Sequence, residues 1–205
     1  MVTVEADPVL VEARLTGGEI RCPVCPGVLG AWGWARARSV VGVGVLRPRR
    51  ARCGSCRVTH VLLPVTVLAR RGYAAVVVWA ALVARAGGSG FRRVAEAVGV
   101  PDTTVRGWLR RMGARLVPVR AWFTRAAVAV GVDVAVPGGL GCAWRDFLAA
   151  VGAAVAAVRW RFGDIGLLGA VTAEQVAVAV SGGALLAPGW PGGLVQHEFT
   201  LPGGR

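Results

Sequence analysis

The sequence of 205 residues predicts a mostly α-helical fold with a small β ribbon near the N-terminus. Two Cys-x-x-Cys motifs flank a valine-rich segment that is typical of strands. After residue 69, apolar residues recur at the spacing of helices. We expect five parts in chain order: an N-terminal segment (1–19), a four-cysteine ribbon (20–68), a helix-turn-helix domain (69–116), a helical region (117–162), and a C-terminal helix with an irregular tail (163–205).

The ribbon is predicted from two cysteine motifs at metal-site spacing. Cys22 and Cys25 lie in "RCPVCPGVLG", Cys53 and Cys56 lie in "RCGSCRVTH", and residues 26–52 separate the two pairs. Zinc binds four thiolates in a tetrahedron, and each Cys-x-x-Cys turn supplies two of them. Glycines in and after the motifs suit tight turns, and "RSVVGVGVLRPRRARC" suits a strand or hairpin within the long spacer. The sequence therefore predicts a structural zinc ribbon with these four cysteines as ligands.

Other chemistry for the cysteines fits the sequence less well. A thioredoxin-like redox site needs a single motif beside a βαβ unit. Two disulfides would need an oxidising compartment, whereas the opening "MVTVEADPVLVEARL" lacks the basic head and apolar run of a secretion signal. His60 follows Cys56 by four residues and is an alternative ligand, although we expect an ordinary polar residue at the start of a strand. Cys142 has no partner at ligand spacing, and we interpret it as a small buried apolar residue.

The basic residues are segregated along the chain. All 24 of them are arginine, and residues 21–125 hold 19 against only Glu96 and Asp102, a local net charge of +17. The remaining residues hold 5 arginines against 9 acidic residues, a net charge of −4, which together give the total of +13. Such segregation predicts that the first two thirds of the chain form an anion-binding surface.

The stretch "FRRVAEAVGVPDTTVRGWLRRM" predicts two helices, over residues 91–98 and from Asp102 onward, joined by a tight turn. Ala95 is small enough for two helices to cross closely, and Gly99 suits a left-handed turn. This pattern is typical of a DNA-binding helix-turn-helix, with an ordinary αα-hairpin as the alternative. The surrounding positive charge favours DNA.

The second of these helices is predicted to read the DNA. If Val105, Trp108 and Leu109 face the core, Asp102, Thr103, Arg106 and Arg110 line the opposite face. Arginine can pair with both acceptors of guanine, and threonine can contact a thymine methyl group or a phosphate. The expected DNA contacts from this helix are Thr103, Thr104, Arg106, Arg110 and Arg111, with Arg92 and Arg93 from the preceding helix and Arg49 and Arg50 from the ribbon.

The ribbon with "LRPRRARCGSCRVTHVLLP", an apolar helix and then "VAEAVGVPDTTVRGWLRR" resemble the N-terminal DNA-binding part of bacterial insertion-sequence transposases and related small zinc-ribbon and helix-turn-helix proteins. The resemblance covers residues 20–115, and "SGGALLAPGWP" looks like a further shared element. It implies that the four cysteines hold zinc, that Arg106 and its helix neighbours read DNA, and that the DNA is the end of a mobile element. Pro26 departs from the family, which usually has glycine there.

The C-terminal third lacks the residues of a transposase nuclease. Two-metal phosphoryl transfer requires converging carboxylates, and no strand pattern brings together the acidic residues after position 125, which are Asp133, Asp146, Asp164, Glu174 and Glu198. Thr172 and Gln175 instead suggest a capping box at the start of a helix. We therefore expect no catalytic residues and a non-enzymatic binding protein.

Two long helices are predicted in this third, from Pro118 to Val130 and from Ala143 to Phe162. The second has an apolar stripe formed by Phe147, Leu148, Val151, Val155 and Val158, with alanine on its other side. The pair either closes the core of the monomer or forms a dimerisation unit. The longest apolar run, "GYAAVVVWAALVA", is too short to span a membrane and suggests a buried helix.

We expect the protein to be cytoplasmic and nucleoid-associated, with zinc as its cofactor. Its expected partners are DNA, a separate transposase or recombinase subunit, and a second copy of the chain, without a membrane. One alternative is a chromosomal transcription regulator. Another is an RNA- or ribosome-associated zinc-ribbon protein, in which Trp32 and Trp34 would stack on bases. We expect these two tryptophans to fill the core of the ribbon instead.

Overall fold

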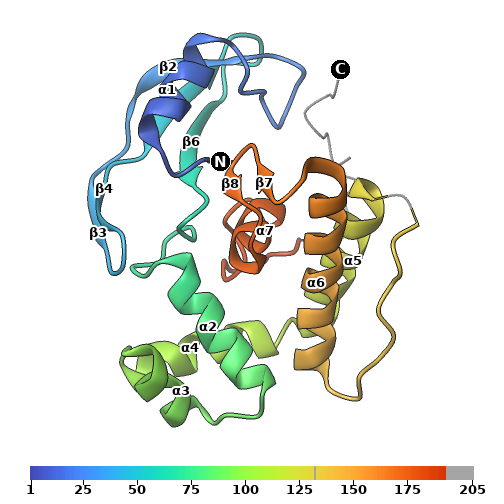
Figure 1. The fold of residues 1–205 in the computed structure, drawn as a ribbon. Helices are drawn as coiled ribbons and strands as arrows, with labels where there is room; N and C mark the ends of the chain where they lie inside the picture. Colours follow the sequence, from blue (N-terminus) through green and yellow to red (C-terminus); the bar gives the residue numbers. More distant parts are fainter. Residues whose placement is uncertain (132, 193–205) are drawn as a thin grey trace.

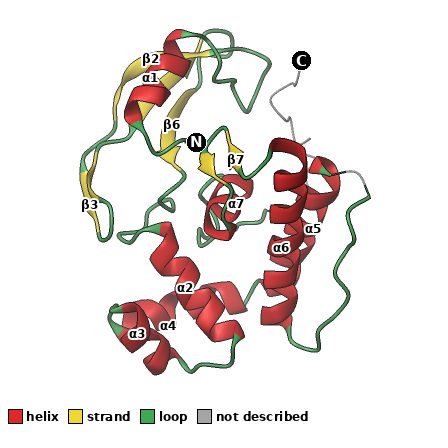
Figure 2. Cartoon of the chain, viewed as in Figure 1, coloured by secondary structure: helices red, strands yellow, loops and turns green. Residues whose placement is uncertain are grey.

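The computed structural model describes residues 1–131 and 133–192, and combines seven helices with short strands in the described part of the chain (Figures 1 and 2). The N-terminal elements are β1 (Val2–Val4), α1 (Pro8–Thr16), β2 (Leu29–Trp34), β3 (Arg38–Val40), β4 (Gly44–Leu46), β5 (Arg49–Cys53) and β6 (Thr59–Pro64). The rest are α2 (Ala75–Ala86), α3 (Phe91–Val98), α4 (Asp102–Gly113), α5 (Leu116–Val130), α6 (Ala143–Phe162), β7 (Ile165–Gly166), β8 (Gly169–Ala170) and α7 (Ala173–Val180).

Four strands form one sheet in the order β1-β6-β5-β2. β5 runs antiparallel to both β2 and β6, while β1 runs parallel to β6, with Val2 opposite Leu62. The segment 1–19, which the sequence suggests is separate, thus supplies an edge strand and a helix to this unit. The spacer between the cysteine pairs contains the expected hairpin, because β3 and β4 pair as a two-stranded sheet of their own.

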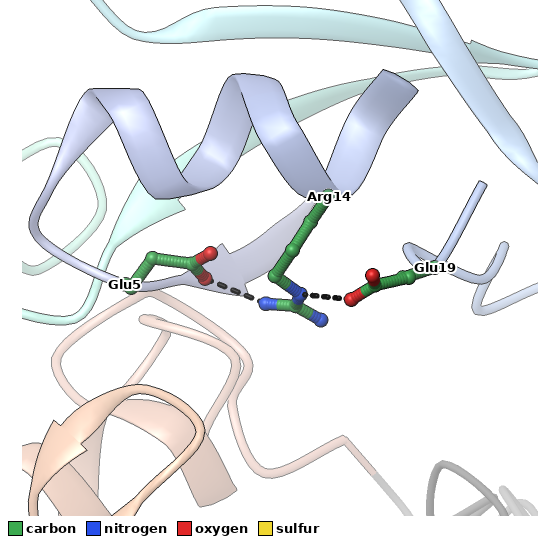
Figure 3. A network of polar contacts seen from close by, with 3 residues as sticks. All are labelled: Glu5, Arg14 and Glu19. Atoms are coloured by element: carbon green, nitrogen blue, oxygen red, sulfur yellow. Dashed lines mark hydrogen bonds and ion pairs between the residues drawn. The ribbon is translucent and has the colours of Figure 1, made fainter. Parts of the chain in front are cut away.

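Helix α1 is stabilised by an N-terminal cap and an ion-pair network, and its buried residues Val11 and Leu15 pack against the sheet. Asp7 caps its first turn by accepting from the amide of Val9 at 2.8 Å. Arg14 donates to the buried carboxylate of Glu5 at 2.6 Å and approaches Glu19 at 3.4 Å (Figure 3). Glu5 is only 3% exposed, so its charge depends on Arg14 for compensation.

Helices α2 to α7 share one apolar core. The boundaries of α3 and α6 are those that the sequence predicts, and α4 begins at Asp102 as predicted, whereas α5 begins at Leu116, two residues before Pro118. The apolar run that starts at Gly72 forms most of α2, which begins at Ala75. In α6 the fully buried positions are Phe147 and Val151 with three alanines, while Leu148, Val155 and Val158 of the expected stripe are only partly buried. The small alanine side chains lie toward the core, which allows α5 and α6 to pack closely.

The segment after α7 joins the helices to the sheet. The amide of Ala69 donates to the carbonyl oxygen of Gly183 at 2.8 Å. Gly183 has a φ of 78°, and a Cβ atom there would clash with the side chain of Leu63 in β6, so only glycine fits. Arg71 and Arg115 donate to carbonyl oxygens of residues 186, 187 and 190. The segment "SGGALLAPGWP" therefore connects the four-stranded sheet to the helical part of the molecule.

The described helices include none that is long and apolar enough to cross a membrane. In Figure 1, the sheet with α1 lies at the top, the α3–α4 pair lies at the bottom, and α7 lies between the sheet and the other helices. The sheet and the α3–α4 pair therefore lie at opposite ends of the molecule in this view.

Candidate metal centre and nucleic-acid surface

The four cysteines of the two motifs converge at one end of the sheet. The sulfur atoms of Cys22, Cys25, Cys53 and Cys56 all lie within 4.8 Å of one another. Among the described residues, no other group of three or more histidine, cysteine or acidic side chains is placed to hold a metal ion. All four are free thiols, so the structure does not contain the alternative pair of disulfides.

The spacing of the sulfurs fits a tetrahedral metal ion. Four thiolates at about 2.3 Å from zinc form a tetrahedron with edges of about 3.8 Å. The Sγ–Sγ distance is 3.7 Å between Cys22 and Cys56, and 3.4 Å between Cys25 and Cys53. Four cysteine ligands leave no coordination position open, which is the arrangement of structural rather than catalytic zinc sites.

Backbone hydrogen bonds close both cysteine turns in the same way. The amide of Cys22 donates to the carbonyl oxygen of Gly27 at 2.8 Å, and the amide of Cys53 donates to that of Val58 at 2.9 Å. Leu29 of β2 lies opposite Cys53 of β5, so the sheet register brings the two turns together.

Gly27 allows the two turns to approach each other. A Cβ atom at this position would lie 2.7 Å from the sulfur of Cys53 and 2.6 Å from Oγ of Ser55. A hydrogen bond also joins the two turns, because the amide of Gly54 donates to the carbonyl oxygen of Val28 at 3.0 Å. The sequence suggests Gly27 only as a turn former, since the atoms it must avoid come from a motif far along the chain.

The thiols do not titrate independently. Burial raises the pKa of Cys53, but the amides of Cys56 and Ser55 and the neighbouring sulfurs outweigh it and lower that pKa to about 6. The amide of Val58 lowers the pKa of Cys56, but burial and the three other sulfurs raise it to about 12. Ionisation of one thiol is therefore favoured, and ionisation of a second thiol beside it is opposed by repulsion between the two negative charges. A divalent cation between the sulfurs would relieve this repulsion.

His60 and Cys142 lie outside the four-sulfur group. His60 is buried in β6, and its Nε2 atom lies 3.5 Å from the sulfur of Cys22. Burial lowers the pKa of His60, and a neutral ring protonated at Nε2 donates to this sulfur and orients it. Cys142 is not the buried residue that the sequence suggests, because it is half-exposed at the N-cap of α6, where the amides of Arg145 and Trp144 lower its pKa.

The second candidate site is the outer face of α4. Val105, Trp108 and Leu109 are buried, and Trp108 packs edge-on against Tyr73 with ring centroids 5.2 Å apart. Gly99 ends α3 with a φ of 65°, the left-handed conformation that the sequence predicts. The helix pair therefore presents its polar stripe to solvent.

The predicted DNA-contacting residues of this pair are mostly exposed. Arg92, Arg93, Thr103, Arg106, Arg110 and Arg111 are exposed, and Thr104 is half-buried. The guanidinium groups of Arg92 and Arg106 both lie over the ring of Phe91, at 5.7 and 5.8 Å. Arg111 extends back over Gly107, where an added Cβ atom would meet its Nη1 at 3.1 Å. None of these arginines forms a salt bridge among the described residues.

The two arginines predicted to contact DNA from the ribbon differ in their surroundings. Arg50 is exposed. Arg49 is half-buried, forms an ion pair with Glu12 at 2.6 Å, and donates to the carbonyl oxygen of Gly33 at 2.8 Å. Arg49 therefore fastens α1 to β2, while Arg50 is free to meet an external anion.

The tryptophans of β2 do not fill the ribbon core as the sequence suggests. Trp32 is 54% exposed and Trp34 is 45% exposed. A β-bulge between Ala31 and Gly33 interrupts the regular register at this point, and the apolar interior is filled instead by α1 and the cysteines. Adjacent small residues in "GAWGWA" are the only sequence signal of this exposure.

The chain matches no protein-family model, no curated protein and no solved structure. The resemblance to insertion-sequence transposases therefore stays an expectation, and the function is argued from the two sites alone.

Proposed function

We propose that this chain is a zinc-containing, non-catalytic DNA-binding protein of transposase-related type. In this proposal a four-cysteine zinc ribbon precedes a helix-turn-helix formed by α3 and α4, and α4 enters the major groove of a DNA site. The observation that carries it is the outward face of α4, where Thr103, Arg106 and Arg110 are exposed without acidic partners among the described residues.

The geometry of the helix pair supports a reading role for α4. Asp102 begins the helix, and Arg106 and Arg110 follow at four-residue spacing, so the three lie on one face. A guanidinium on such a face can donate to O6 and N7 of guanine together. Arg92 and Arg93 are exposed on α3, and in this proposal they would meet phosphates, which position a protein but carry no sequence information.

The metal would have a structural role in this proposal. It would join the turn before β2 to the turn after β5, because each turn supplies two of the four ligands. In sites of this kind the free energy of metal binding contributes directly to folding. The ribbon would then hold Arg50 in place for contacts to the phosphate backbone.

Selection of bound sequences from a random duplex DNA pool tests this proposal. The zinc-loaded protein should enrich a defined sequence, and the metal-free protein should enrich it less because the ribbon arginines lose their support. Recovery of a pool without any preferred sequence would contradict the reading role of α4. The same DNA-binding residues would serve a mobile-element protein that acts beside a separate transposase or recombinase subunit, and they would equally serve a chromosomal regulator. The enriched DNA sequence distinguishes the mobile-element protein from the regulator.

A further inference from the structure

The strand β2 carries two exposed tryptophans, and an arginine lies over each ring. The guanidinium carbon of Arg52 lies 4.6 Å from the ring centroid of Trp32, and that of Arg49 lies 4.7 Å from the centroid of Trp34. Arg47 approaches Trp34 from 5.8 Å. We refer to these five residues as the tryptophan–arginine platform.

Hydrogen bonds hold the arginines of this platform in place. Arg52 donates from Nε to the carbonyl oxygen of Arg57 at 3.0 Å, and Arg49 is fixed by Glu12 and the carbonyl oxygen of Gly33. The rings are thus in contact with fixed arginines, and the two tryptophan residues are still 54% and 45% exposed to solvent. Large aromatic side chains held at the surface in this way mark a binding site rather than a core.

The charge around the platform selects an anionic ligand. No acidic residue occurs between Glu19 and Glu96, Arg36 and Arg50 are exposed near the platform in sequence, and Glu12 pairs with only one platform arginine, Arg49. Exposed aromatic rings beside exposed cations match a chain of unpaired nucleotides, whose bases stack on the rings while its phosphates meet Arg47 and Arg50. In a duplex the faces of the bases are stacked on one another and cannot stack on the tryptophan rings. The platform would therefore bind nucleic acid in a different way from α4, which is proposed to contact base edges in the major groove.

We infer that the tryptophan–arginine platform binds single-stranded DNA, as a second nucleic-acid site separate from α4. The guanidinium groups that lie against the two rings can donate to a phosphate and equally to a ribose 2′-hydroxyl oxygen, so the choice of DNA over RNA rests on the proposed DNA-binding function. The platform by itself does not distinguish DNA from RNA. It extends the proposed function, since a protein with both sites could hold a duplex beside an unpaired strand.

The test is fluorescence anisotropy of a labelled oligodeoxythymidylate of about 12 nucleotides, a length within the range that single-strand sites cover. The zinc-loaded full chain is compared with Trp32→Ala, Trp34→Ala and the conservative Trp32→Phe. The matched control is Trp160→Ala, because Trp160 is 70% exposed and belongs to α6 rather than to the sheet that carries the platform (Figure 1). Trp32→Ala and Trp34→Ala should each weaken oligonucleotide binding about tenfold. Trp32→Phe should retain most of the wild-type affinity, and Trp160→Ala should leave the affinity unchanged.

Other outcomes would overturn the inference. Equal binding by the wild type and both platform variants would show that the rings do not stack on bases. Tighter binding of an oligouridylate of the same length would overturn the assignment to DNA. Arg106→Ala separates this inference from the proposed function: it should leave single-strand binding unchanged, and its effect on duplex DNA tests α4 alone.

Discussion

Replacing Gly27 by alanine tests the metal centre through a single added atom. The new Cβ would lie 2.7 Å from the sulfur of Cys53. Non-bonded heavy atoms prefer separations of about 3.5–4.0 Å, so the sulfur or the turn must move by roughly 1 Å. Metal–ligand distances in a well-formed site are held within about 0.2 Å, and a displacement of this size exceeds that tolerance.

We expect Gly27→Ala to weaken zinc binding by about 10–100-fold, the range seen when the supports of metal ligands are removed. Competition between the protein and a chromogenic chelator measures this affinity directly. Gly54→Ala is the matched control, because Gly54 lies inside the second cysteine turn but its Cβ atom would meet no atom closer than 3.9 Å. Its affinity should stay within about twofold of the wild type on the same argument.

Equal zinc affinities for Gly27→Ala and the wild type would refute the close packing of the two turns. The same conclusion would follow if Gly54→Ala had the larger effect. Loss of zinc by Gly27→Ala alone would support four ligands drawn from both turns.

Three further outcomes can be measured. Arg14→Ala should lower the free energy of unfolding by about 3 kcal/mol, because it leaves Glu5 charged and buried, whereas an equal effect of Glu19→Ala, which removes an exposed partner, would contradict this. In denaturant unfolding, Gly99→Ala should cost about 1 kcal/mol and Gly99→Asn less, since asparagine tolerates the left-handed conformation; the reverse order would be inconsistent with the turn. In the metal-free reduced protein, the pKa of Cys53 falls from 9.0 to about 6 on folding. Cys53 therefore contributes stability that grows as the pH rises from 6 to 9, whereas Cys56, whose pKa is raised to about 12, reverses this gain above pH 9. Parallel stability–pH curves for the wild type and Cys53→Ser between pH 6 and 9 would contradict this.

Local signals made the helix pair predictable from the sequence. Gly99 sets the left-handed end of α3, and Pro101 lies immediately before α4, so both boundaries follow from residues inside the segment. The convergence of the four cysteines was predictable for a similar reason, because their spacing and residue type match one metal geometry.

Features that depend on distant partners were not predictable. β1 joins β6 across about sixty residues, and nothing in "VTV" indicates that partner. Arg49 and Arg50 look alike in the sequence, but the alternation of the strand directs only Arg49 toward Glu12. The exposure of Trp32 and Trp34 follows from the β-bulge in β2 and from a core already filled by α1, neither of which has a clear signal in the sequence.

The most direct test of the proposed DNA-binding function compares Arg106→Ala with Arg50→Ala on two duplexes, the selected sequence and a random one. Arg106→Ala should cost about 1–3 kcal/mol on the selected duplex and little on the random one, because it removes a base contact. Arg50→Ala should weaken both alike and reduce the dependence of binding on salt by about one ion, because it removes a phosphate contact. If the two variants lose the same affinity on both duplexes, α4 does not read DNA sequence.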